Sequence, residues 1–281
     1  MLSGNRKPAS PKDRALGAEL RKLRNAAGMS LAAVCEVLNW KESTLSRVER
    51  GQRSFSPETV MALALIYKIP HDLREKLIAW AKETPSLGWW DRQPAGIPTE
   101  LGALAAYEQD VTRAVDWSPG IVPGLLQTPA YAEAVMREWG VPQDDIGARL
   151  RARRRRQDLL DRPNVEYVAL LGTSALRNQL CDREEFVQQL QHIHRMSLRD
   201  SLTIRIVEKP TALAIGSWYL MYFDQAGPAV LIEHHESSTF LFDEETKAYV
   251  DARRRLSNGA LSEQETRDRL EVEIDRVRTG G

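Results

Sequence analysis

One stretch, SLAAVCEVLNWKESTLSRVERG at residues 30–51, constrains the fold more than any other part of this chain. Ser30 is a typical helix N-cap, and apolar residues recur at helical spacing after it. Asn39 tolerates the left-handed backbone of a tight turn, and a second helical pattern runs from Ser43 to Arg50 until Gly51 stops it. The apolar positions of the two helices are Val34, Val37, Leu38, Leu45 and Val48. The stretch therefore predicts two short helices joined by a turn of nearly fixed length.

Two helices joined in this way cross steeply, and the second can lie in the major groove of DNA. Cys35 falls where the helices approach most closely, a position that only a small side chain fits, and Trp40 can plug the corner. The plainer alternative is any two helices of an all-α bundle, which the SR-x-E-x-G ending and the flanking helices disfavour. The flanking patterns contain Leu16, Leu20 and Leu23 before the pair, and Ser56, Pro57, Glu58, Leu63, Leu65, Ile66 and Tyr67 after it, followed by a helix at 71–83.

The stretch resembles the lambda-repressor-like (XRE-type) helix-turn-helix, in which Ala and Gly are usual at the positions of Cys35 and Asn39. The resemblance implies an all-α N-terminal domain that binds double-stranded DNA. Arg24 and Glu49 match positions that form an internal ion pair in that family. We therefore expect these two residues to have a structural role.

The same resemblance implies roles for the outward side chains of the second helix. An arginine there can donate two hydrogen bonds to guanine, and a glutamate can accept one from cytosine. Phosphate contacts position a protein without reading the sequence. The resemblance accordingly implies base reading by Glu42, Ser43 and Arg47, and phosphate binding by Lys41, Ser46, Arg50 and Arg53.

Positive charge is concentrated near the N-terminus, although the whole chain has no formal net charge. Residues 1–54 contain eleven Lys or Arg and five Asp or Glu. A local positive field is expected around a phosphate-binding motif. Overall neutrality argues against a protein that coats nucleic acid along its whole surface.

The composition also indicates the cellular compartment of the protein. No apolar run approaches the length of a membrane span, and the N-terminus lacks the apolar core of a signal peptide. Cys35 and Cys181 are far apart, which fits a reduced environment better than a disulfide scaffold. We expect a cytoplasmic protein without membrane contacts.

Length and composition predict two domains joined by a linker. The linker carries Trp89 and Trp90, which either dock onto a domain or, together with Trp117, form a partner or ligand surface. The expected parts are a disordered basic arm at 1–11, the helix-turn-helix domain at 12–83, the linker at 84–99 and a second domain at 100–279.

The second domain is predicted to be α+β with a mostly antiparallel sheet, because helix pairs flank strands that short turns connect. Helices are expected at 100–115, 129–139, 143–160, 183–196, 244–256 and 262–277, and strands at 165–171, 202–207, 218–223, 229–233 and 239–242.

A second resemblance rests on the signature VPGLLQT at 122–128, followed by Tyr131 and Ala132. The chain here is similar to the C-terminal domain of the actinomycete antitoxin-like (WhiJ-like) transcriptional regulators. Thr173 and Glu208 depart from the pattern usual in that family, which puts any site at those positions in doubt. The further matches are Arg153, Arg156, Gln157, Arg177, Gln189 and Glu233. The resemblance implies control by a small acidic partner protein encoded nearby, as in an antitoxin-like pair.

The arginine-rich run at 149–156 allows two interpretations. A helix with six arginines around its circumference cannot aim them all at one groove. The plainer interpretation is a solvated helix with acidic neighbours, namely Asp144, Asp145, Asp158 and Asp161. The other is a secondary contact with DNA or an acidic partner.

Metal binding and catalysis are not expected. His234 and His235 would point to opposite faces of a strand, and His192 and His194 are poorly spaced for one helix face. The sequence supplies no local base that would activate Ser174 or Cys181 as a nucleophile. We therefore expect no cofactor, no metal and no enzymatic activity.

The sequence as a whole predicts a sequence-specific transcriptional regulator that acts as a homodimer and is controlled through its second domain. One alternative is a small-molecule-sensing repressor with an apolar pocket lined by Trp89, Trp90, Trp218 and Tyr219. A less favoured alternative is a C-terminal enzyme. The candidate dimer contacts, which could equally pack inside the chain, are Leu256, Leu261, Leu270, Val272, Ile274 and Val277.

Overall fold

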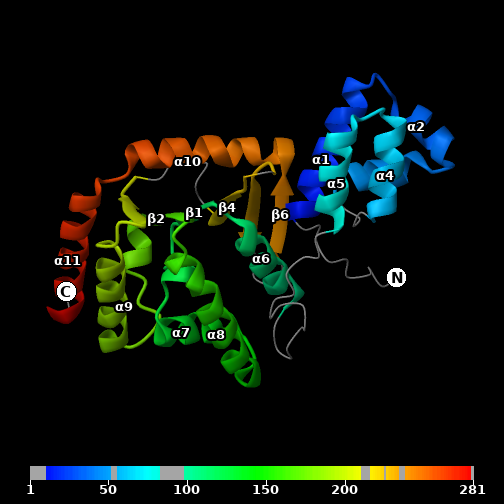
Figure 1. Ribbon diagram of the computed structural model, residues 1–281. Coiled ribbons are helices and arrows are strands. Elements are labelled where there is room, and N and C mark those ends of the chain that lie inside the picture. Colours follow the sequence, from blue (N-terminus) through cyan, green and yellow to red (C-terminus); the bar gives the residue numbers. More distant parts are fainter. Residues whose placement is uncertain are drawn as a thin grey trace. The chain divides into compact units, whose positions relative to one another are not determined.

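The protein separates into an N-terminal unit that runs to residue 92 and a C-terminal unit that holds nearly all of the rest. Figure 1 shows the ribbon of the computed structural model. The structure describes residues 11–51, 56–82, 98–209, 216–224, 226–233 and 238–279.

The described N-terminal unit is helical, and local signals in the sequence fix the ends of its helices. The Ser30 hydroxyl accepts a hydrogen bond from the backbone N–H of Ala33 at 3.1 Å, which caps α2. Asn39 ends that helix with a φ of 53°, and Ser56 caps α4 with Pro57 in its first turn. The helices are α1 (Pro11–Ala26), α2 (Leu31–Leu38), α3 (Glu42–Glu49), α4 (Pro57–Ile66) and α5 (His71–Lys82).

These helices enclose one apolar core, built around Leu20, Val34, Leu45 and Leu63. Two apolar residues that the sequence pattern assigned to helix interiors lie outside it. Val37 is 65% exposed, because the inner side of the two-turn helix α2 is already occupied by its neighbours in the pattern. Leu65 is 56% exposed for the same reason on α4.

The C-terminal unit combines helices with a six-stranded mixed sheet, as the α+β prediction required. Its helices are α6 (Thr99–Asp110), α7 (Pro129–Glu138), α8 (Gln143–Gln157), α9 (Arg183–Met196), α10 (Lys247–Gly259) and α11 (Glu263–Thr279), with 3-10 turns η2 (Gly124–Leu126), η3 (Asp158–Asp161), η4 (Thr173–Leu176) and η6 (Asp243–Thr246). Its strands are β1 (Arg113–Ser118), β2 (Glu166–Gly172), β3 (Leu202–Val207), β4 (Trp218–Tyr222), β5 (Ala229–Glu233) and β6 (Ser238–Phe242).

The strands follow the order β3-β2-β1-β4-β5-β6. β1 pairs in parallel with β2, which pairs in parallel with β3, while β1–β4, β4–β5 and β5–β6 are antiparallel. Side chains alternate between the two faces along each strand. The core on one face includes residues of α6, α7, α9 and α11, whereas α10 covers the other face, as Figure 1 shows.

The expected helix at 100–115 was wrong at its C-terminal end. The helix stops at Asp110, and residues 113–118 form the strand β1 at the centre of the sheet. Its two charged residues, Arg113 and Asp116, interrupt the apolar pattern by which a central strand is recognised. The expected helix at 143–160 likewise ends at Gln157, where a 3-10 turn follows.

The candidate dimer contacts on the last two helices mostly pack inside the chain. Leu256, Leu270, Ile274 and Val277 are buried in the two cores, and Leu261 packs partly against one of them. Only Val272 of this set is largely exposed, at 61%. Within the described residues, no helix has both the length and the apolar character needed to cross a lipid bilayer.

Candidate functional site

Helix α3 presents a polar side to solvent. Leu45 and Val48 are buried against the other helices, and the side chains on the opposite side remain accessible. Arg53 lies outside the described residues. Of the other residues expected to contact DNA, Ser46 is half-buried. The exposed ones are Lys41, Glu42, Ser43, Arg47 and Arg50.

The two arginines of this side are held along the helix. Arg47 Nε donates to the Ser43 carbonyl at 2.9 Å, and Arg50 Nε donates to the Ser46 carbonyl at 3.2 Å. Arg50 also donates to the Ser46 hydroxyl at 2.6 Å. The terminal nitrogens of Arg47 keep the paired donors that a guanine edge requires.

A buried ion pair ties α3 to α1. Arg24 Nε donates to one Glu49 oxygen at 2.6 Å and Arg24 Nη2 to the other at 3.0 Å. Donating to the Glu49 carboxylate raises the pKa of Arg24, and Arg24 also donates to the Met29 carbonyl at 2.7 Å. The helices approach so closely that a Cβ at Gly17 would lie 2.7 Å from the Glu49 carbonyl oxygen. The orientation of α3 is therefore fixed from its buried side.

In the C-terminal unit, glutamine side chains hold the VPGLLQT turn. Gln189 accepts from the Thr128 N–H at 2.7 Å and donates to the Leu126 carbonyl at 2.8 Å. Gln157 donates to the carbonyl of Gln127 at 2.8 Å. Leu126 and its apolar neighbours in the turn enter the core, and α7 begins after the Thr128 cap. The turn is thus a rigid element between α8 and α9.

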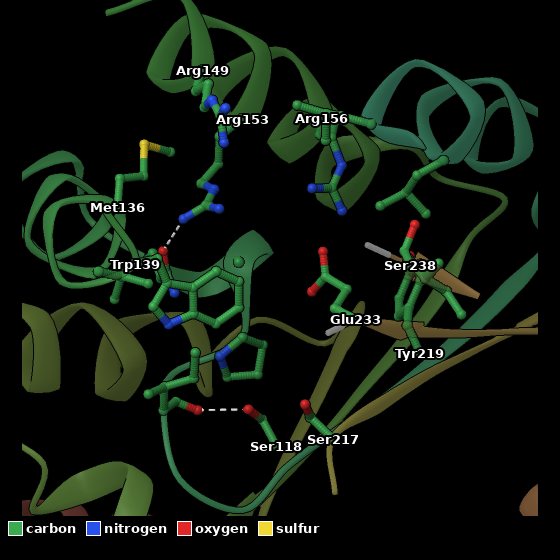
Figure 2. A pocket seen from close by; sticks show the side chains of 18 of the residues that line it. Ser118, Met136, Trp139, Arg149, Arg153, Arg156, Ser217, Tyr219, Glu233 and Ser238 are labelled. Carbon is green, nitrogen blue, oxygen red and sulfur yellow. Dashed lines mark hydrogen bonds between the residues drawn. The ribbon is translucent and has the colours of Figure 1, made fainter. Parts of the chain in front are cut away.

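A cavity of about 510 Å³ lies beside this turn, and Figure 2 shows it from close by. Its lining comes from α6, the end of α7, α8, the turn itself and the strands β1, β4 and β5. A volume of this size is typical of small-molecule sites. Its apolar lining includes Leu101, Ile121, Pro123, Met136, Trp139 and Leu231.

Three arginines of α8, Arg149, Arg153 and Arg156, line the cavity at a spacing that places them on one side of the helix. Arg156 forms two hydrogen bonds of 2.8 Å with the Glu108 carboxylate. Arg153 donates to the Gln127 side-chain oxygen, and no carboxylate among the described residues forms an ion pair with it. Figure 2 shows Arg153 and Arg156 reaching from α8 toward the cavity.

Two carboxylates face these arginines from the sheet. Asp116 of β1 and Glu233 of β5 line the same cavity, and the Tyr167 hydroxyl donates to Asp116 at 3.2 Å. Burial, reinforced by the nearby Glu233, raises the pKa of Asp116 to about 7. Burial, reinforced by repulsion from Arg156, lowers the pKa of Arg153 to about 10. The cavity therefore combines charged side chains with its apolar lining.

Two of the aromatic residues predicted to form a partner or ligand surface, Trp117 and Trp218, belong to the core on the α10 face of the sheet. Trp117 is fully buried on this face of the sheet, because it alternates with Asp116 along β1, so its assignment to a surface was wrong. Trp218 packs edge-on against Tyr249 on that same face. Trp89 and Trp90 lie outside the described residues. Tyr219 belongs to the core on the other face, and both Trp218 and Tyr219 line the cavity.

The six arginines of the run at 149–156 lie in two different environments, solvent and the cavity. Arg151, Arg154 and Arg155 are exposed, whereas the remaining three arginines line the cavity. Asp161 pairs with Arg199 of the segment after α9, so it does not neutralise the run. Sequence reasoning missed Asp116, Glu108 and Trp139, although the i, i+4, i+7 spacing of the arginines was a readable signal.

Of the four histidines that were weighed and not favoured as metal ligands, His234 and His235 lie outside the described residues. Among the residues that the structure describes, no three His, Cys, Asp or Glu side chains gather as a metal site. Burial lowers the pKa of His192, and His194 pairs with Glu271 at 3.4 Å. Burial raises the pKa of Cys181 to about 11, which disfavours the reactive thiolate.

The fold and the exposed side of α3 define the N-terminal unit as a helix-turn-helix DNA-binding domain, and residues 15–77 match the family model described as "Helix-turn-helix domain". Residues 101–272 match the "Domain of unknown function (DUF5753)". Because this match spans more than half of the chain, the protein belongs to the DUF5753 family. No curated protein and no solved structure matched the chain.

Proposed function

We propose that this protein is a sequence-specific transcriptional regulator that reads an operator with α3. The observation that carries the proposal is the exposed polar side of α3, whose opposite side is fixed by the Arg24–Glu49 pair. In this proposal Glu42, Ser43 and Arg47 read bases. The phosphate contacts come from Lys41, Ser46, Arg50 and Arg53.

The proposal is tested by the change Arg47→Ala. Loss of a bidentate guanine contact should cost about 1–3 kcal/mol on the cognate operator and relax the preference at one base pair. The operator is first selected from random duplexes, and affinities are then measured by fluorescence anisotropy at fixed salt. Arg254→Ala, which removes an exposed arginine of α10, is the matched control. Equal losses on cognate and random duplexes would assign Arg47 to the phosphates instead.

The regulator is further proposed to act as a homodimer on paired half-sites, because a single helix-turn-helix buries little DNA surface. The packing of the last two helices inside the chain leaves the dimer surface unassigned among the described residues. Light scattering at micromolar concentration, with and without operator duplex, should give the mass of a dimer. A monomer under both conditions would reject this part of the proposal.

Control through the C-terminal domain has two candidate forms. The similarity to the antitoxin-like (WhiJ-like) regulators supports control by a small acidic partner protein encoded nearby. The charged cavity beside the VPGLLQT turn supports a small-molecule-sensing regulator instead, and it is the structural observation that favours this second form. In both proposed forms the domain binds and does not catalyse. Binding can alter DNA affinity only if the occupant prefers one state of the protein.

A further inference from the structure

The cavity in the C-terminal unit has charges of opposite sign on different walls. Arg153 enters it from α8, while Glu233 enters from β5 and Asp116 from β1. Figure 2 shows the Arg153 guanidinium and the Glu233 carboxylate both directed into the open space. The cavity lining also includes apolar side chains, among them Trp139 and Met136. The cavity thus combines charges of both signs with apolar lining.

Arg153 lines this cavity without a direct ion pair to any described carboxylate, and the negative charge of Glu233 only partly offsets the lowering of its pKa. Its neighbour Arg156 is held by both oxygens of Glu108 at 2.8 Å, so that charge is already balanced. Arg153 contacts a neutral partner, the side-chain amide of Gln127, and forms no ion pair with any described carboxylate. A half-buried guanidinium without a paired anion lowers the stability of the free protein, and a bound anion would remove this penalty.

The opposite wall carries two acids that repel each other. Glu233 raises the pKa of Asp116, an effect that adds to burial. Neither acid forms an ion pair within the described part of the chain, and the polar contact of Asp116 is the donated hydrogen bond from Tyr167. A positively charged hydrogen-bond donor would reduce the repulsion between the two acids, just as a bound anion would stabilise the charge of Arg153.

We propose that the cavity binds a small zwitterion with an apolar body, such as a short peptide or an amino-acid derivative. Its carboxylate lies beside Arg153, its protonated amine lies beside Glu233 and Asp116, and its apolar part packs on Trp139 and Met136. The proposal rests on the small-molecule-sensing form of the proposed function for its biological consequence. A multiply charged phosphate fits less well, because the acids of the sheet wall repel it.

The test uses three matched probes: the dipeptide L-leucyl-L-phenylalanine, its C-terminal amide and its N-acetyl derivative. Binding to the full-length protein is measured without DNA, by calorimetry and by the fluorescence of Trp139, which lines the cavity. The dipeptide should bind, and each derivative should bind about tenfold more weakly or worse, because each loses one charge-assisted contact.

Two variants assign each end of the probe. Arg153→Met should weaken the dipeptide about tenfold and abolish its advantage over the amide, while Glu233→Gln should abolish its advantage over the N-acetyl derivative. Arg154→Met is the matched control, since Arg154 is the exposed neighbour on the same helix, and it should leave all three affinities unchanged. Thermal unfolding of each variant verifies that the protein remains folded.

Three results would overturn the proposal. They are an absence of binding by all three probes at millimolar concentration, equal binding of the dipeptide and both derivatives, and dipeptide binding that is unchanged in Arg153→Met. Failure of the proposed function looks different. In that case the dipeptide binds and depends on Arg153 as described, yet it leaves operator affinity unchanged.

Discussion

Arg24 in the N-terminal unit and Arg153 in the C-terminal unit both enter the protein interior from helices, and the protein treats their charges differently. Arg24 meets both oxygens of Glu49, and its third nitrogen reaches a backbone carbonyl. Arg153 reaches only the neutral amide of Gln127. The Glu49 carboxylate balances the charge of Arg24 within the folded chain, whereas no described carboxylate forms an ion pair with Arg153.

The difference separates a structural charge from a binding charge. Burying an ion pair costs the desolvation energy of both partners. Removing one partner alone is destabilising, because the other charge is then buried and unpaired. A buried cation without a counter-charge is a stability cost in the free protein and a source of affinity for an anion. The same substitution should therefore have opposite effects at the two positions.

The largest effect is expected from Arg24→Met. This change leaves the Glu49 carboxylate buried without its partner, so the free energy of unfolding should fall by about 3–5 kcal/mol. Urea unfolding followed by circular dichroism measures it. Glu36→Gln, which removes an exposed charge on α2, serves as the control and should change stability little. A loss below about 1 kcal/mol, the range of exposed pairs, would show that the pair does not fix α3.

A smaller change of opposite sign is expected from Arg153→Met. Removing the uncompensated guanidinium should leave the free protein equally stable or more stable by up to about 1 kcal/mol, since apolar replacements of buried charges are often stabilising. The comparison uses the same urea titration. Clear destabilisation, like that of Arg24→Met, would indicate that Arg153 is structural too and would remove the contrast between the two arginines.

The third effect depends on pH. Asp116 has a folded pKa of about 7, above the value of about 3.9 for an unfolded chain. Between these values the folded state holds a proton that the unfolded state has released, so the stability contributed by Asp116 falls as the pH rises from about 4 to 7. Asp116→Asn should flatten that part of the stability profile. The charged and titratable groups around Asp116 are Glu233, Tyr167, Arg156 and Glu108.

Thermal unfolding of wild type and Asp116→Asn across this pH range tests the prediction. The two curves should converge at low pH and separate toward neutral pH, where the wild type is the less stable protein. Parallel curves would mean that Asp116 ionises in the folded protein as it does in the unfolded chain.

Local signals made the N-terminal unit predictable from sequence. Ser30 and Ser56 cap helices and Asn39 adopts the left-handed turn, because each of these features depends on residues within a few positions. Periodicity was less reliable at individual positions. Val37 fits a helical repeat and yet faces solvent, since on a two-turn helix the core can accept only part of an apolar set.

The cavity could not be predicted in the same way, because long-range pairing creates it. Asp116 and Glu233 are neighbours only because β1 and β5 both flank β4. The strand β1 was itself missed, since Arg113 and the cavity-lining Asp116 both break the apolar pattern. The signature VPGLLQT and its matches did mark the right region, although Gln157 and Gln189 hold the turn and only Arg153 of the three lines the cavity.

The central position of β1 also has a consequence for synthesis on the ribosome. β1 emerges early and pairs with β2 on one side, but its other partner, β4, begins only at Trp218. Until the ribosome has added about a hundred further residues, the edge of β1 that later pairs with β4 has unpaired backbone groups. Exposed strand edges of this kind promote aggregation. Chains truncated before β4 should therefore be the species that chaperones retain or proteases remove.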